Sequence, residues 1–179
     1  MKGIVFNLLE EAVSNDFGEA TWDKLLDEAD LSGAYTSLGN YPDSEVVALV
    51  DAASKALNLP TQDVLRWFGQ RAIPSMVARY PVFFSSHTET RSFLLTLNNV
   101  IHPEVHKLYP GANTPMFDFG AGDDGGLIIG YSSPRKLCAL AEGFMQGAAK
   151  HFQEQADITQ SQCMHEGASK CVLHVRFHQ

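Results

Sequence analysis

A chain of 179 residues, 45% of them hydrophobic, can bury one substantial core, so a single domain covering residues 1–179 is expected. The formal net charge is -8 at pH 7, and Lys and Arg do not cluster as phosphate backbones require, which excludes nucleic acid as a partner. Residues 1–12 lack a signal-peptide core, and no stretch approaches the roughly 20 apolar residues of a membrane span, so a cytoplasmic protein without membrane contact is expected.

The N-terminal part of the chain is predicted to form short helices. Apolar residues recur at helical spacing between residues 4 and 13, and again between residues 46 and 53. The second of these helices begins near Asp43 or Ser44 and ends before Pro60. A further helix begins at Thr61, and Pro74 is expected to end or kink it.

Residues 91–109 have apolar side chains on more than one side of a predicted helix, which is typical of a partly buried helix. Pro103 interrupts this pattern. A break is therefore expected near His102, and Pro103 also disfavours helical geometry at His102 itself.

After residue 111 the hydrophobic period changes to that of strands. Two strands are predicted at residues 116–119 and 127–131, and the Gly-rich segment between them is a turn. Ser133 followed by Pro134 predicts the start of a long helix that continues to about Phe152.

The C-terminal end of the chain is predicted to form a terminal hairpin. Its strands are residues 157–164 and 170–177, and its buried face is formed by Cys171, Leu173, Val175 and Phe177. The fold class is therefore α+β: a helical N-terminal part, then a small antiparallel sheet with an inserted long helix.

Two histidines in the 91–109 segment are candidate metal ligands. An imidazole that binds iron would need to lie in a largely apolar helix, as His102 does. His106 is one helical turn away on the same face, so periodicity does not choose between them. Taken alone, a histidine on an apolar helix face is more often a core or boundary residue than a metal ligand.

Tyr131, Ser133 and Arg135 alternate where a predicted strand gives way to a helix. If the chain stays extended there, all three side chains point to one side. Two hydroxyls and a guanidinium suit a pair of carboxylates, since Arg binds carboxylates bidentately. The alternative is an ordinary strand end with a capping Ser and an exposed Arg.

The combination of these residues resembles the haem nitric oxide/oxygen-binding (H-NOX) family, which includes the haem domain of soluble guanylate cyclase. His102 stands seven residues before Tyr109 and thirteen before Pro115, and the pattern Tyr131-x-Ser133-x-Arg135 follows. The opening Met1-Lys2-Gly3 is also similar, so the resemblance covers essentially the whole chain.

The resemblance implies a fold that encloses a haem b, with a distal helical part of about residues 1–60 and a proximal part with the sheet of about residues 61–179. It makes His102 the proximal iron ligand and His106 a surface or helix-end residue. Pro115 would press on the macrocycle and bend it, and Tyr131, Ser133 and Arg135 would bind the propionates.

The resemblance also bears on which gas is bound. Oxygen-binding relatives place a tyrosine hydroxyl over the bound oxygen, and the matching position here is Leu140, which has no donor. The other positions that are distal by similarity are apolar as well: Val5, Leu9, Ala72, Met76 and Phe144. A hydrogen bond of this charged kind is worth roughly 1.5 to 3 kcal/mol, so nitric oxide and carbon monoxide are the expected ligands and oxygen is excluded.

The expected function is a sensor and not an enzyme. By resemblance, nitric oxide binds ferrous iron and releases His102, and the signal passes to a separate protein, such as a histidine kinase or a cyclic-di-GMP enzyme. The residues show no nucleophile with a base and no phosphate loop, and residues 120–126 are better explained as a hairpin turn.

Three cysteines, Cys138, Cys163 and Cys171, raise a second possibility. They could hold tetrahedral zinc with a fourth ligand, as in some bacterial members of the family. The histidine that those members have a few residues before the second cysteine is missing here, and His165 is the nearest substitute. Free thiols or a thiol-based redox switch are the alternatives.

A haem-free binding module is the competing interpretation. The C-terminal region, with Glu142-Gly143, Gly147, Cys163, Gly167 and Cys171, also resembles a small-molecule-binding domain of the vinyl-reductase type. That interpretation leaves His102 and Pro115 unexplained, and haem absorption by the purified protein would distinguish the two.

Overall fold

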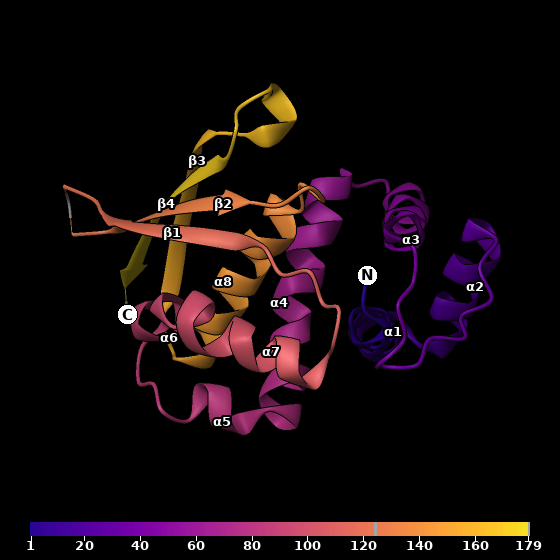
Figure 1. The fold of residues 1–179 in the computed structure, drawn as a ribbon. Helices are drawn as coiled ribbons and strands as arrows, with labels where there is room; N and C mark the ends of the chain where they lie inside the picture. The colour runs from indigo at the N-terminus through magenta and orange to yellow at the C-terminus, as the bar shows by residue number, and fades with distance from the viewer. Residues whose placement is uncertain (124, 179) are drawn as a thin grey trace.

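The computed structural model describes residues 1–123 and 125–178 and has the expected α+β architecture (Figure 1). The helices of the first half are α1 (Gly3–Phe17), α2 (Glu19–Ala29), α3 (Asp43–Leu57), α4 (Thr61–Arg79) and α5 (Pro81–Phe84). The later elements are α6 (Thr90–Leu95), the π-helix η1 (Leu97–Ile101), α7 (His102–Leu108), β1 (Met116–Ala121), β2 (Leu127–Ser132), α8 (Cys138–His151), β3 (Gln155–Gln162), the 3-10 turn η2 (Met164–Glu166) and β4 (Cys171–His178).

The first three helices form a lobe beside α4 (Figure 1). Gly18 has φ of 88°, a value that glycine adopts without strain, and this lets α2 begin directly after α1 ends. The lobe has its own core, to which α1 to α3 and the first half of α4 contribute; Phe6, Leu49, Val64 and Phe68 are almost completely buried there.

The sheet has the strand order β1-β2-β4-β3, and every neighbouring pair is antiparallel. Helix α8 connects β2 to β3 and covers one face of the sheet, as predicted for the inserted helix (Figure 1). Cys171, Leu173 and Val175 are buried, Phe177 is half-buried and packs against the core under the sheet, and His174 and Arg176 are exposed. The predicted buried face of the last strand is therefore confirmed.

Helices α4 and α8 cross at unusually short range. A Cβ atom on Gly143 would lie 2.2 Å from the carbonyl oxygen of Arg66, and one on Gly69 would lie 2.6 Å from the carbonyl oxygen of Leu140. Beside this crossing, the guanidinium of Arg66 forms an ion pair with the buried carboxylate of Glu142. The crossing joins the N-terminal core to a second core under the sheet.

The structure corrects one predicted helix boundary and excludes one of the two outcomes expected at Pro74. Pro74 does not end α4, which continues to Arg79, and the Gln70 carbonyl that loses its helical partner there packs against α8 beside Gly147. Helix α8 begins at Cys138 and not near Pro134. Lys136 has a positive φ of 51°, and the N–H of Leu137 donates to the Tyr131 hydroxyl, so residues before Cys138 form a turn.

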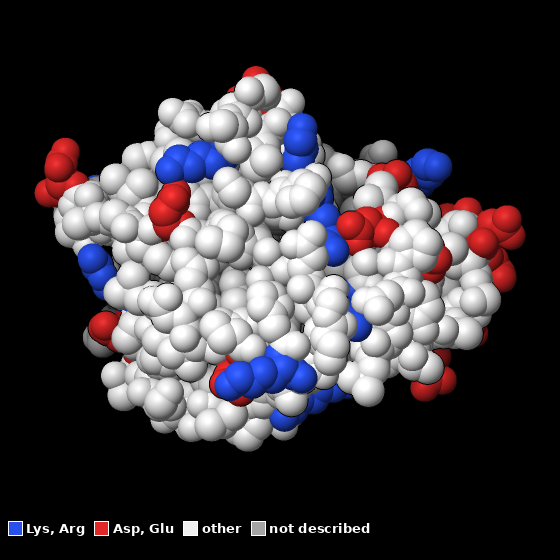
Figure 2. All heavy atoms as spheres, viewed as in Figure 1, with Lys and Arg blue, Asp and Glu red and all other residues white. Residues whose placement is uncertain are grey.

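The negative charge is concentrated on the N-terminal lobe. Residues 1–60 contain 11 of the 21 acidic residues and 3 of the 13 basic residues. Figure 2 shows acidic side chains gathered over the side formed by α2 and α3. None of the helices in the described part of the chain combines the length and apolarity that a bilayer crossing needs.

Candidate haem and thiol sites

His102 is the first residue of α7, and its side chain is half-buried. Its ring centroid lies 5.9 Å from that of Phe117, which in turn lies 5.7 Å from that of Tyr131. Phe117 therefore lies between the candidate iron ligand and the first residue of the Tyr131-x-Ser133-x-Arg135 motif. Helix α7 and the sheet together bring these two parts of the predicted site close.

The imidazole of His102 is in the protonation state that metal binding requires. Burial, and to a smaller extent the neighbouring His106, lower the pKa of His102 to about 4, so the ring is neutral at physiological pH. Within residues 1–123 and 125–178, neither ring nitrogen has a hydrogen-bond partner. A nitrogen lone pair is thus available to a metal ion, which fits the proximal role that the resemblance implies.

The backbone at His102 differs from the prediction. Its φ and ψ are -63° and -40°, which is ordinary helical geometry, so Pro103 does not disturb it. Proline is tolerated in the first turn of a helix, because its missing N–H would have no partner there. The break that was predicted near His102 lies directly before this residue, in the π-helical turn η1.

The six positions assigned to the distal side all belong to the N-terminal core or pack against it. Leu9, Ala72 and Leu140 are buried in the N-terminal core, and Val5, Met76 and Phe144 pack against it. Met76 and Phe144 also pack against the second core, so this apolar set reaches the boundary between the two cores. None of the six side chains has a hydrogen-bond donor.

Within the motif Tyr131-x-Ser133-x-Arg135, a hydrogen bond joins Ser133 to Arg135, and Tyr131 is bonded to the segment that follows the motif. The buried hydroxyl oxygen of Tyr131 accepts the N–H of Leu137 at 3.0 Å, which leaves its proton available to an acceptor. Burial raises the pKa of Tyr131, so this hydroxyl stays protonated. The Ser133 hydroxyl oxygen accepts the backbone N–H of Arg135 at 3.3 Å.

The guanidinium of Arg135 already binds a carboxylate. Its Nε lies 2.8 Å from Oδ2 of Asp43, and Oδ1 of Asp43 lies 2.6 Å from the amino group of Met1. Burial raises the pKa of Asp43, but hydrogen bonds from Met1 and Arg135 outweigh it, so this pKa lies below its usual range. From the sequence, Asp43 can be identified only as a helix start, since nothing local indicates a contact 92 residues away.

Pro115 and His106 are both near the candidate ligand in the chain. Pro115 is half-buried and directly precedes β1. His106 is exposed, and its Nε2 lies 3.1 Å from the Thr114 hydroxyl. The exposed position of His106 agrees with its expected place at the surface.

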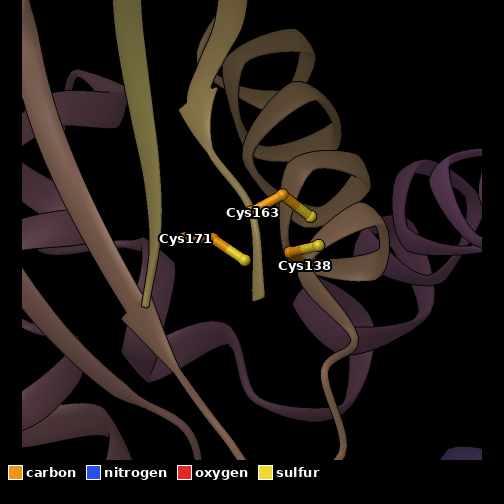
Figure 3. Close-up of side chains that lie close together, drawn as sticks. All are labelled: Cys138, Cys163 and Cys171. Carbon is orange, nitrogen blue, oxygen red and sulfur yellow. The ribbon is translucent and has the colours of Figure 1, made fainter. Parts of the chain in front are cut away.

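The three cysteines converge, although they are far apart in the chain (Figure 3). Cys138 begins α8, Cys163 follows β3 and Cys171 begins β4, and their sulfur atoms lie within 4.8 Å of one another. Burial and the neighbouring thiols raise the pKa of Cys138 to about 12. His165 lies outside this cluster of sulfur atoms, and its Nε2 lies 2.7 Å from the carbonyl oxygen of Lys136.

Comparison with known proteins identifies the family. Residues 2–160 match the family described as Haem-NO-binding. An H-NOX protein from Shewanella oneidensis in the Fe(II)NO ligation state is 35% identical, with a TM-score of 0.93 over 100% of both chains. The Fe(II) unliganded H-NOX protein from K. algicida is 26% identical, with a TM-score of 0.88 over 100% of this chain and 97% of that chain.

A third relative has been solved with a different ligand. The IWP-051-bound H-NOX from Shewanella woodyi, in the Fe(II)CO ligation state, is 29% identical, and the TM-score is 0.81 over 98% of this chain and 93% of that chain. The shared fold and the family match define a protein of the haem-based gas-sensor class. The chain belongs to the H-NOX family.

The contact between Asp43 and Arg135 makes a prediction about pH. A carboxyl whose pKa is lower in the folded state contributes stability above its unfolded pKa of about 3.9, and this stability is lost as the pH falls through the folded pKa. We expect Asp43→Asn to lower the free energy of unfolding of the haem-free protein by roughly 0.5 to 1 kcal/mol at pH 7, a modest value because the Asp43 side chain is 47% exposed.

The measurement is urea unfolding of both proteins at neutral and acidic pH; the difference between them should shrink as the pH falls below about 3.9 and vanish once Asp43 is protonated in the folded state. Asp51→Asn is the matched control, since Asp51 is an exposed acid on the same helix and forms no ion pair with described residues. A difference that persists at low pH, or an equal loss in the control, would contradict the prediction.

Proposed function

We propose that this chain is a haem-based nitric oxide sensor that holds haem b through His102 and signals to a separate protein. The observation that carries the proposal is the half-buried imidazole of His102, which is neutral and, in the described part of the chain, has no hydrogen-bond partner. Relatives with nitric oxide and carbon monoxide on ferrous iron support both gases as ligands.

Haem, when bound, supplies the ferrous iron at which a diatomic gas binds. In this proposal His102 binds the iron and Pro115 contacts the macrocycle. Arg135, with the hydroxyls of Tyr131 and Ser133, binds the propionates. In the structure, the guanidinium of Arg135 binds the carboxylate of Asp43. This contact supports the proposed role, because a haem propionate is also a carboxylate.

The signalling step is the release of His102 when nitric oxide binds. A ligand shifts a conformational equilibrium only by its different affinity for the two states, so the lost bond to His102 must supply that difference. Release frees α7 to move relative to Pro115 and β1, which follow it in the chain.

The proposed choice of gas rests on Leu140. This residue is buried on α8 in the N-terminal core, to which the other five positions also belong or against which they pack, and none of the six can donate a hydrogen bond. Oxygen bound to iron has partial negative charge and gains most from a donor, whereas nitric oxide is expected to depend on it much less. The chain therefore discriminates against oxygen.

The protein that receives the signal would be a histidine kinase or a cyclic-di-GMP enzyme. The sensor itself would work in the cytoplasm and would not be an enzyme. These assignments come from the resemblance to stand-alone bacterial members of the family. We also propose that the chain is one domain with a distal part of about residues 1–60 and a proximal part of about residues 61–179.

A zinc site on the three thiols is a second candidate function, favoured by one observation. Cys138, Cys163 and Cys171 place three sulfur atoms within 4.8 Å of one another, which suits tetrahedral zinc with one further ligand. His165 is the nearest candidate for that ligand: its Nε2 lies 2.7 Å from the Lys136 carbonyl oxygen, so Nδ1 is the nitrogen that would have to turn toward the sulfur atoms. Without a metal ion, the same three thiols could form a redox switch.

The haem proposal is tested by an anaerobic absorption spectrum of the reduced, haem-loaded protein before and after nitric oxide. We expect five-coordinate ferrous iron at first, and again after the gas is added, because His102 leaves the iron. His102→Ala should abolish the first spectrum, whereas His106→Ala on the same helix should leave it unchanged.

Six-coordinate iron after nitric oxide addition would contradict the release of His102. Failure of the unaltered protein to hold haem would favour the haem-free binding module. A spectrum changed by His106→Ala and unchanged by His102→Ala would show that the wrong histidine has been assigned.

The gas assignment predicts that Leu140→Tyr gains oxygen affinity. A phenol at this position adds a hydrogen-bond donor, which is worth about 10- to 100-fold in affinity. Oxygen titration of the reduced protein measures it. Leu140→Phe is the matched control, because it adds the ring without the hydroxyl, and an equal gain in this control would show that the donor is not the cause.

For the thiol cluster we expect one zinc ion per chain after purification with zinc. Replacement of Cys138, Cys163 or Cys171 by Ser should lower the zinc content, since each removes one of three sulfur ligands. His165→Ala should leave it unchanged, because His165 lies outside the cluster of three sulfur atoms. Zinc-free protein whose thiols form a reversible disulfide would favour the redox switch instead.

A further inference from the structure

Helix α7 carries His102 but has little packing of its own. None of its residues is fully buried, and its main contacts are with η1, the segment directly before it. Apart from Val105, which is half-buried and packs against the second core, apolar side chains contribute little to holding α7 in position. Two sets of side-chain hydrogen bonds lie at its ends instead.

The first contact lies before α7 and involves Asn98 in η1. Its Nδ2 donates to the carbonyl oxygen of Phe117 at 2.5 Å, and its Oδ1 accepts the N–H of Phe117 at 3.3 Å. Strand β1 is at the edge of the sheet, so one row of its backbone groups has no partner strand. The amide of Asn98 takes the place of a strand residue and ties η1 to β1.

The second contact lies after α7 and joins two phenols. Tyr109 directly follows α7 and is buried, and its hydroxyl forms a hydrogen bond with the hydroxyl of Tyr80, which ends α4. This contact ties the C-terminal end of α7 to the helix that crosses α8. Asn98 lies four residues before His102, and Tyr109 lies seven residues after it.

We infer that Asn98 and the pair Tyr80 and Tyr109 are positioning residues for His102: they anchor α7 at both ends and so set how easily His102 leaves a bound iron. The consequence for the iron rests on the proposed function, whereas the anchoring of α7 does not. Because the two contacts lead to β1 and to α4, the helix can shift only when at least one of them yields.

The anchoring is tested first without haem, by hydrogen exchange of the backbone amides in residues 97–109. A hydrogen bond of this kind contributes about 1 kcal/mol, so Asn98→Leu and Tyr109→Phe should each speed exchange there roughly 5- to 10-fold. Tyr80→Phe, and the double variant that combines Tyr80→Phe with Tyr109→Phe, should speed exchange as much as Tyr109→Phe alone. The two hydroxyls form a single hydrogen bond, so removing the second one adds nothing.

Two matched controls lie in the N-terminal lobe. Asn7 makes two side-chain hydrogen bonds, with Tyr35 and Ser37, and the Tyr35 hydroxyl donates to Glu45. Asn7→Leu and Tyr35→Phe therefore remove the same chemical groups away from α7. They should leave exchange in residues 97–109 unchanged.

The effect on the ligand is measured in the reduced, haem-loaded protein. The iron–histidine stretching band in the resonance Raman spectrum should shift in Asn98→Leu and Tyr109→Phe but not in the controls. In these two variants, the conversion to five-coordinate iron after nitric oxide is added should be about 5- to 10-fold faster. One of the two hydrogen-bond contacts that anchor α7 is already missing, so fewer bonds must break before α7 moves.

Unchanged exchange in Tyr109→Phe and Asn98→Leu would overturn the inference. Faster exchange with an unaltered stretching band and rate would also overturn it, since the contacts would then be merely structural. If His102→Ala shows that His102 does not bind iron, the proposed function fails, and exchange in the haem-free protein still decides whether α7 is anchored.

Discussion

The close crossing of α4 and α8 is the contact on which the rest of the structure depends. Gly69 and Gly143 leave no room for a Cβ atom between the two backbones, and the Arg66 ion pair to the buried Glu142 lies beside them. At this distance Ala72 and Leu140 belong to one core, although they lie in different halves of the chain. The same crossing places the start of α8, and with it Cys138, against the sheet.

Much of the fold could be predicted because its periodicities are local. The alternation of Cys171, Leu173 and Val175 identified the buried face of β4 correctly, since one face of the sheet packs on α8. The start of α8 was predicted wrongly because Ser133 and Pro134 are typical of a helix start. A tertiary contact, the Tyr131 hydroxyl on the Leu137 N–H, makes a turn there instead.

The candidate site was predicted through the family resemblance more than through local pattern. Helical spacing could not choose between His102 and His106, and burial is what separates them in the structure. The contacts of Arg135 with Asp43, of Asn98 with Phe117 and of Tyr109 with Tyr80 join residues far apart in the chain. No local sequence signal predicts such pairs, because each depends on how whole elements pack.

The bond from Asn98 to β1 also has a consequence for how the protein behaves at high concentration. Exposed sheet edges invite pairing with another chain, and proteins protect them with covering segments, bulges and polar residues. Asn98 covers the β1 edge at Phe117, and at the opposite edge β3 has an irregularity between Gln160 and Gln162. Each edge of the sheet thus has a local feature that disfavours strand-to-strand pairing, and loss of the Asn98 amide would leave the outer backbone groups of Phe117 without this partner.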